Sequence, residues 1–159
     1  MITIKNILII IVIFNRFVSN NYIKMQQIEV KSIIKAPISK VWECWTSPNH
    51  IVNWNFASND WHCPKAENNL VIGGEFHYLM SAKDESFSFD FWGTYVNIEK
   101  GRYLQIVLGD GRKMAVIFEF LDNETIITEK FDPETENPLE LQKKGWQMIL
   151  DNFKFYVEK

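Results

Sequence analysis

The sequence has few of the residues that would place it in a specialised protein class. Its 159 residues include only two cysteines, too few for a disulfide scaffold or a four-cysteine zinc site. Basic residues number 17 against 20 acidic ones, which argues against a protein that binds nucleic acid by neutralising phosphates. The phosphate-binding patterns G-x-x-x-x-G-K-[ST] and G-x-G-x-x-G are absent. Hydrophobic residues make up 47% and aromatic residues 14%, which indicates one globular domain with an aromatic-rich core.

The first 24 residues differ in composition from the rest, because they contain no Gly, Ala, Pro, Asp or Glu. Their apolar stretch, residues 7–14, is far shorter than the roughly 20 residues that a membrane-spanning helix needs, so we expect no stable membrane insertion. Three interpretations stay open: a weak signal or membrane anchor, a loosely packed tail, or a leader before a natural start at Met25. We favour the last, with a domain over residues 25–159 and a cytoplasmic location. A membrane-anchored or exported protein is the alternative if residues 1–24 are retained.

Hydrophobic periodicity and turn residues predict a strand, two short helices, five more strands and one long helix. The only long helix is the last, so it should cover one face of an antiparallel sheet. Residues 55–69 are expected to be irregular. The predicted strands are residues 28–36, 75–82, 87–98, 103–108, 113–121 and 124–131, and the short helices lie between residues 38 and 54.

The last helix has a clear beginning in the sequence. Asn137 is a good N-cap residue, Pro138 suits the first helical position, and Glu140 the third. Gly145 lies inside the helix, where glycine is unfavourable, which predicts close approach of another backbone.

Alternation along the strands places aromatic residues and methionine on one face of the sheet, with the last helix against it. A solid aromatic core is one interpretation. We favour a cavity for an apolar ligand, because a curved sheet and a straight helix cannot touch everywhere. The predicted ligand-binding residues are Trp54, Phe76, Tyr78, Met80, Phe89, Phe91, Met114, Val116, Phe118, Trp146, Leu150 and Phe153.

The titratable residues indicate neither a metal site nor a catalytic set. The cysteines and two histidines have the spacing C-x5-H-x11-H-C, which matches no usual zinc pattern. Glu129 would have a raised pKa if it faced the apolar side of its strand, and it could then act as an acid, base or ligand anchor. The strand register is ambiguous, and we favour a solvated Glu129. His77 is expected on the outer face, paired with Glu75.

Four motifs occur in a characteristic order: APISKVWECWTSP at residues 36–48 followed by Trp54, GGEF at 73–76, FDFWGTY at 89–95, and GW at 145–146. Together they resemble the activator-of-heat-shock-protein-90-ATPase homologue family of the START-like, or SRPBCC, superfamily. The resemblance covers nearly everything after about Ile28. It implies an α+β helix-grip (Bet v 1-like) fold, in which a curved antiparallel sheet wraps around a long C-terminal helix. Members of the superfamily typically bind lipids, sterols or polyketides between sheet and helix, and a minority are enzymes.

The residues and the resemblance together predict a domain that binds a hydrophobic small molecule or lipid, without a metal or cofactor. Two alternatives stay open. One is a stress-response protein that stimulates the ATPase of a chaperone partner, which the resemblance implies. The other is a cyclase or hydrolase that uses Glu129 or Tyr78 inside the cavity. Because no catalytic motif can be carried over residue by residue, we expect binding rather than catalysis.

Overall fold

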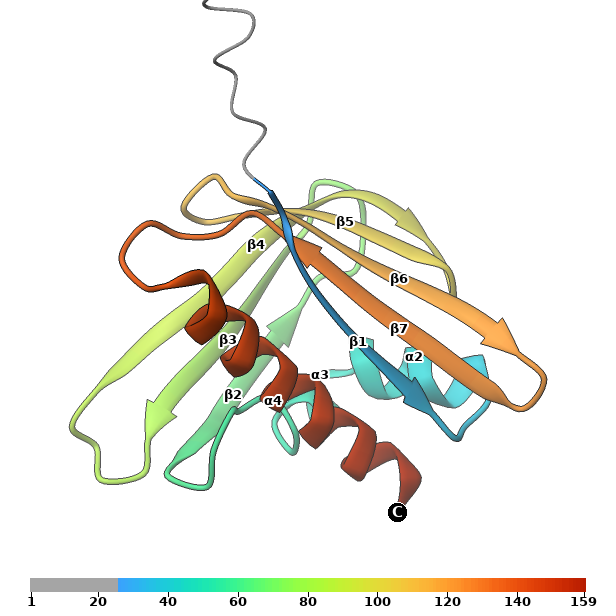
Figure 1. Cartoon of the computed structure of the whole chain (residues 1–159), viewed down its shortest axis with the longest axis horizontal. Coiled ribbons are helices and arrows are strands. Elements are labelled where there is room, and N and C mark those ends of the chain that lie inside the picture. Colours follow the sequence, from blue (N-terminus) through green and yellow to red (C-terminus); the bar gives the residue numbers. More distant parts are fainter. Residues whose placement is uncertain (1–25) are drawn as a thin grey trace, which may run out of the picture.

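The computed structural model describes residues 26–159. The expectations for residues 1–24 and for a start at Met25 lie outside the described residues. Seven antiparallel strands form one curled sheet, and helix α4 (Leu139–Glu158) lies across its concave face (Figure 1). This arrangement is the helix-grip fold that the resemblance implied. Within residues 26–159, no helix is both long and apolar enough to cross a membrane.

The described strands have the order β1-β7-β6-β5-β4-β3-β2 in the sheet, so β1 alone among them lies outside the sequence order. Two short helices, α2 (Ile38–Thr46) and α3 (Pro48–Ile51), connect the two edge strands β1 and β2. The strands are β1 (Ile28–Ile34), β2 (Trp61–Asn68), β3 (Glu75–Ala82), β4 (Ser88–Glu99), β5 (Tyr103–Leu108), β6 (Lys113–Leu121) and β7 (Glu124–Phe131).

The elements follow the predicted order with one additional strand, β2, and four strands, β3, β5, β6 and β7, have the predicted bounds. The prediction of an irregular segment over residues 55–69 is wrong in its second half, where β2 pairs with β3. This strand contains Pro64, and its register shifts between His62 and Lys65. Proline and a bulge are tolerated in an edge strand, but they hide the alternation by which a strand is recognised in sequence.

Helix α4 begins one residue later than predicted and without the predicted cap. Its N-cap residue is Pro138, and no side chain makes a capping hydrogen bond. The buried side chain of Gln142 instead ties the preceding loop to the helix, because its Nε2 donates to the carbonyl oxygen of Asn137 at 2.7 Å and its Oε1 accepts from the Glu134 N–H at 2.9 Å. The expectation of a backbone close to Gly145 is also wrong, since no atom beyond its own helix and chain neighbours lies within 4 Å of an added Cβ.

The end of the sheet next to α2 and α3 has a solid aromatic core. The ring of Phe153, from α4, lies 4.9 Å from that of Trp45 and 4.8 Å from that of Trp54. Phe118, on strand β6, packs against the same group, and its ring lies 5.7 Å from the ring of Trp45 and 5.3 Å from the ring of Trp42. The Trp54 indole N–H donates to the Cys44 carbonyl oxygen at 3.0 Å, so its only polar atom is satisfied. This packing fixes one end of α4 against the sheet.

Candidate ligand-binding cavity

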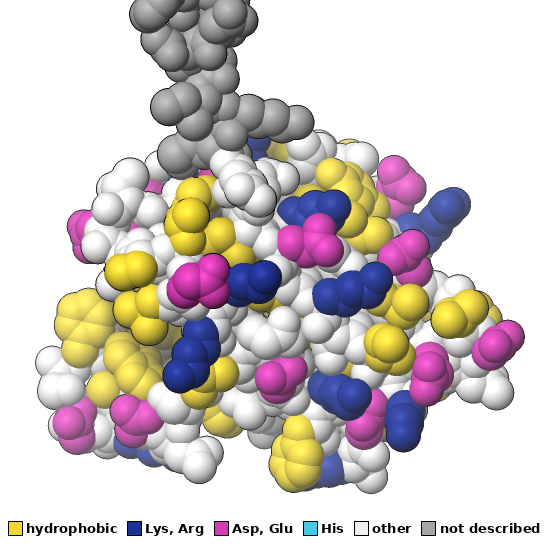
Figure 2. Space-filling view, viewed as in Figure 1, with side chains coloured by type: hydrophobic (Ala, Val, Ile, Leu, Met, Phe, Trp, Pro, Cys, Tyr) yellow, Lys and Arg dark blue, Asp and Glu magenta, His cyan; other side chains and the backbone are white. Residues whose placement is uncertain are grey.

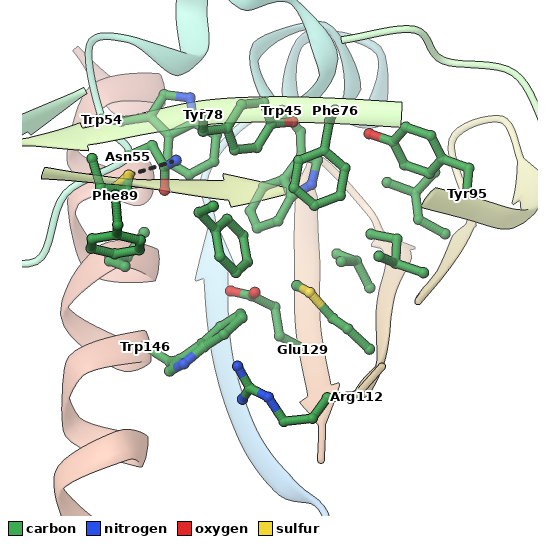
Figure 3. A pocket seen from close by; sticks show the side chains of 17 residues that line it. Trp45, Trp54, Asn55, Phe76, Tyr78, Phe89, Tyr95, Arg112, Glu129 and Trp146 are labelled. Carbon is green, nitrogen blue, oxygen red and sulfur yellow. Dashed lines mark hydrogen bonds between the residues drawn. The ribbon is translucent and has the colours of Figure 1, made fainter. Parts of the chain in front are cut away.

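A cavity of about 270 Å³ lies between the concave face of the sheet and α4, beyond the solid aromatic end (Figure 3). Trp45 and Trp54 belong both to the solid core and to the cavity wall, so they form the boundary between the two. The lining residues are Trp45, Trp54, Asn55, Phe76, Tyr78, Met80, Phe89, Phe91, Tyr95, Leu104, Ile106, Arg112, Met114, Val116, Glu129, Trp146 and Ile149.

Nine of the twelve predicted ligand-binding residues lie on this wall, and the other three do not. Phe118, Leu150 and Phe153 are almost completely buried within the core, away from the cavity. Alternation assigned them to the interior correctly, because it reports the face of an element. It does not report the position along the element, and that position separates the solid end from the hollow end.

The apolar walls of the cavity are held by contacts between their own rings. Trp146, on α4, stacks on Phe131 with 4.0 Å between ring centroids and meets Phe91 edge to face at 5.7 Å. Across the cavity, the ring of Phe76 lies 4.7 Å from that of Tyr78 and 5.6 Å from that of Phe91. Aromatic pairs at these separations are attractive beyond their buried area. The cavity therefore has walls that are formed before any ligand arrives.

One carboxyl side chain, Glu129, lies inside this apolar space. Its partners across the sheet are Val30 on β1 and Val116 on β6, both buried, and its own side chain is only 3% exposed. The preference for a solvated Glu129 is therefore wrong. The fully buried Ile127 and Phe131 show which face of β7 is internal, but the sequence has isoleucine at two successive positions and leaves the register open.

The carboxyl group of Glu129 has no hydrogen-bond partner among residues 26–159, and burial raises its pKa from 4.5 to about 8. Figure 3 shows this group pointing into the cavity beside the indole of Trp146. The guanidinium of Arg112 also lines the cavity, but it is bound to other groups. Its Nε donates to Asp110 at 2.7 Å and its Nη1 to the carbonyl oxygen of Asp132 at 3.2 Å. These contacts hold the guanidinium of Arg112 against Asp110 and the carbonyl of Asp132, at the hairpin between β5 and β6.

The tyrosines of the cavity wall are neutral, and Tyr95 is hydrogen-bonded within the protein. The Tyr95 hydroxyl donates to Asn68 at 2.9 Å, and Asn68 in turn donates to the carbonyl oxygen of Thr46 at 2.6 Å. Burial raises the pKa of Tyr95 to about 12 and the pKa of Tyr78 well above its usual value of 10. Both phenols therefore stay protonated at neutral pH, and Tyr78 does not supply a phenolate base for the cyclase or hydrolase alternative.

Outside the cavity, His77 lies on the outer face of the sheet as predicted. Its Nδ1 is 2.7 Å from Asp90 and its Nε2 is 3.4 Å from Glu75, and the hydrogen bond to Asp90 is the main cause of its raised pKa. Burial raises the pKa of Cys63 to about 11, so this cysteine is a thiol at neutral pH. No group of three or more His, Cys, Asp and Glu side chains in residues 26–159 is placed to hold a metal ion.

A comparison with known protein families identifies the family of this chain. Residues 35–158 match the family described as Activator of Hsp90 ATPase homolog 1-like protein. The chain belongs to this family. The resemblance drawn from the four sequence motifs is thereby confirmed, and the fold agrees with the START-like superfamily.

Solved structures of Activator of Hsp90 ATPase homolog 1-like proteins and related folds support the assignment. The AHSA1-like protein of Aeromonas hydrophila is 42% identical, with a TM-score of 0.76 over 82% of this chain and 92% of its own. A protein of Cytophaga hutchinsonii is 46% identical, with a TM-score of 0.73 over 83% and 92%. A protein of Chromobacterium violaceum, 18% identical with a TM-score of 0.75 over 84% and 98%, shares the fold. No match was found among proteins with curated descriptions.

Proposed function

We propose that this domain binds a hydrophobic small molecule or lipid in the cavity between the sheet and α4. The observation that carries the proposal is a cavity of about 270 Å³ inside an otherwise closely packed aromatic core. Protein interiors rarely contain voids larger than a water molecule, and an empty void lowers stability. Small-molecule sites have volumes of roughly 300–1,000 Å³, so this cavity, slightly below that range, suits a small ligand.

The composition of the wall indicates how such a ligand would bind. Most of the lining side chains are aromatic or aliphatic, so affinity would come mainly from apolar surface removed from water, at about 25 cal/mol per Å². Because the rings already support one another, little ordering of the wall would be needed on binding. The few polar groups would then select among ligands of similar size.

The direct test is native mass spectrometry of the full-length chain as purified, followed by extraction and identification of any bound molecule. In parallel, ethylnaphthalene is added as a purely apolar probe, and binding is followed by quenching of tryptophan fluorescence. Trp45, Trp54 and Trp146 all line the cavity, so a ligand there contacts the reporting side chains. We expect saturable quenching with one probe molecule per chain.

A matched pair of α4 variants locates the bound probe. Ile149 lines the cavity, whereas Leu141 lies on the same helix and is 57% exposed. Ile149→Phe fills part of the cavity and should weaken probe binding, while Leu141→Phe adds the same ring at the surface and should leave it unchanged. Equal binding by both variants, or no binding of probe or co-purified molecule by the wild type, would contradict the proposal.

A second candidate, stimulation of a chaperone ATPase, is favoured by the family description and by an exposed aromatic patch. This patch consists of Trp61, Phe87 and Phe89, whose rings lie 6.0–6.3 Å apart; Phe87 is 59% exposed and Phe89 is 44% exposed. Figure 2 shows hydrophobic side chains gathered on the β3–β4 side of the molecule, with charges of both signs over the rest of this face. Exposed apolar groups of this kind often mark protein contacts.

The chaperone candidate is tested by adding the protein to an Hsp90-type chaperone and measuring ATP turnover. A contact through the aromatic patch predicts a change in turnover that Phe87→Ser abolishes. Unchanged turnover at saturating protein would eliminate this function and leave ligand binding unaffected.

A further inference from the structure

We propose that the ligand of this cavity is a neutral molecule with one hydrogen-bond-accepting oxygen, a carbonyl or an ether, which receives a hydrogen bond from the carboxyl group of Glu129. The inference deepens the proposed function and rests on it, because it names the chemical class that the cavity selects. It assigns Glu129 as the residue that determines specificity within an otherwise apolar wall.

The first argument is the missing partner of Glu129. Nine in ten or more buried polar groups in proteins have a hydrogen-bond partner. Glu129 is only 3% exposed, and no described residue donates to or accepts from its carboxyl group. Among residues 26–159 no fully enclosed side-chain oxygen or nitrogen lacks a partner, so the carboxyl oxygens border the open space of the cavity. Its neighbours across the sheet, Val30 and Val116, offer only carbon. The carboxyl group points into the cavity, so a bound molecule is positioned to supply the partner (Figure 3).

The second argument is the protonation state of this group. The other titratable side chains of the cavity are Tyr78 and Tyr95, which stay neutral, and Arg112, whose guanidinium is bound to Asp110 and to the carbonyl of Asp132. The packed helix α4 contributes uncharged side chains to the wall. With its pKa raised to about 8 by burial, Glu129 is mainly protonated at neutral pH. It then carries an O–H donor with no acceptor among residues 26–159.

The third argument separates an acceptor oxygen from the other obvious partner, a ligand ammonium. An ion pair would require Glu129 to lose its proton and the ammonium to leave water, and buried ion pairs often fail to recover these costs. A carbonyl or ether oxygen needs neither change. The apolar remainder of the ligand would lie against Phe91 and Trp146, and Trp146 is fixed from behind by its stacking on Phe131.

The experiment compares three naphthalenes substituted at the same ring position: ethylnaphthalene, acetylnaphthalene and aminomethylnaphthalene. The three compounds have similar shapes. Ethylnaphthalene offers no hydrogen-bond acceptor, acetylnaphthalene offers a carbonyl oxygen, and aminomethylnaphthalene carries a cation. Each is titrated into the full-length chain at pH 6.5, and quenching of tryptophan fluorescence is measured. One hydrogen bond predicts that acetylnaphthalene binds about fivefold more tightly than ethylnaphthalene, and aminomethylnaphthalene most weakly.

Two variants and a pH series assign the preference to Glu129. Glu129→Gln keeps a donor of similar shape that does not titrate, so it should retain the preference for acetylnaphthalene at every pH. Glu129→Leu lacks the donor and should bind acetylnaphthalene and ethylnaphthalene equally. In the wild type, the preference should disappear between pH 7 and 9, because the carboxylate formed there has no proton to donate.

The outcomes separate this inference from the proposed function. If ethylnaphthalene and acetylnaphthalene bind the wild type equally, the cavity binds apolar molecules but Glu129 does not select them, and the inference is overturned. Tightest binding of aminomethylnaphthalene would overturn it in favour of a cationic ligand. If none of the three binds, the proposed function fails and the inference fails with it.

Discussion

At the scale of single residues, Glu129 is the position where the chain departs from the simplest way of building its core. A valine or leucine would match the flanking Val30 and Val116 and would leave no unpaired polar group. Taking a carboxylate out of water disfavours its charged form in the folded state, and the raised pKa of Glu129 expresses this cost. A residue that lowers stability at a cavity wall is more readily understood as part of a binding site than as part of the scaffold.

The first prediction is that Glu129 makes stability depend on pH in a direction opposite to most carboxylates. Its folded pKa of about 8 lies above the ordinary 4.5, so the folded state binds its proton more tightly. This contribution is fully present below pH 4.5 and is lost as pH rises to about 8, at up to about 1.4 kcal/mol per unit and about 5 kcal/mol in total. Glu129→Gln removes it.

Urea unfolding of wild type and Glu129→Gln at pH 5, 6.5, 8 and 9 measures this effect. The free energy of unfolding of the variant should exceed that of the wild type by a margin that grows from pH 5 to 8 and is constant above. Other titrating groups are common to both chains and cancel in the difference. Parallel curves would mean that the pKa of Glu129 is the same in the folded and unfolded states, and that burial does not raise it.

At the scale of elements, α4 shows what its sequence could and could not predict. The apolar stripe that includes Leu150 and Phe153 was recognised from its spacing and is buried as expected. The helix cap and the reason for Gly145 were not predicted correctly, because both depend on what lies beside the helix. The structure shows open space at Gly145, so neither a turn nor a close approach requires glycine there.

The second prediction is that Gly145→Ala stabilises the protein. Alanine is favoured over glycine in a helix interior by about 1 kcal/mol, and the new Cβ meets nothing within 4 Å outside its own helix and chain neighbours. The free energy of unfolding in urea should rise by about 0.5–1 kcal/mol. Gly93→Ala is the control, because a Cβ there would lie 2.9–3.0 Å from Ile106 and Phe76 and should destabilise the sheet. A loss of stability in Gly145→Ala would contradict the argument.

At the scale of the whole molecule, the fold could be predicted because the order of elements and four motifs agree with one architecture. The identity of the interior face could also be predicted, since strands expose alternate faces. Two properties of the site could not be predicted from the sequence. Strand alternation left Glu129 ambiguous, and no local pattern indicates where along α4 the interior changes from solid, at Phe153, to hollow, at Trp146. Both depend on how the curled sheet and the helix diverge in space.

The last prediction tests this division of the interior into a solid and a hollow end. Phe153 is fully buried between Trp45 and Trp54, so Phe153→Ala should leave a new void and cost about 3–5 kcal/mol. Phe91 already borders empty space and is only partly buried, so Phe91→Ala should cost about 1.5 kcal/mol, mainly for lost transfer from water.

Urea unfolding gives both values, and ethylnaphthalene titration gives the complementary result. Phe91→Ala should weaken probe binding because it removes part of the wall, whereas Phe153→Ala should leave the affinity of the folded fraction nearly unchanged. If Phe91→Ala were the more destabilising of the two, the cavity beside it would have to be filled by protein in solution. The ligand-binding function would then lose its physical basis, because a filled core offers no space to bind.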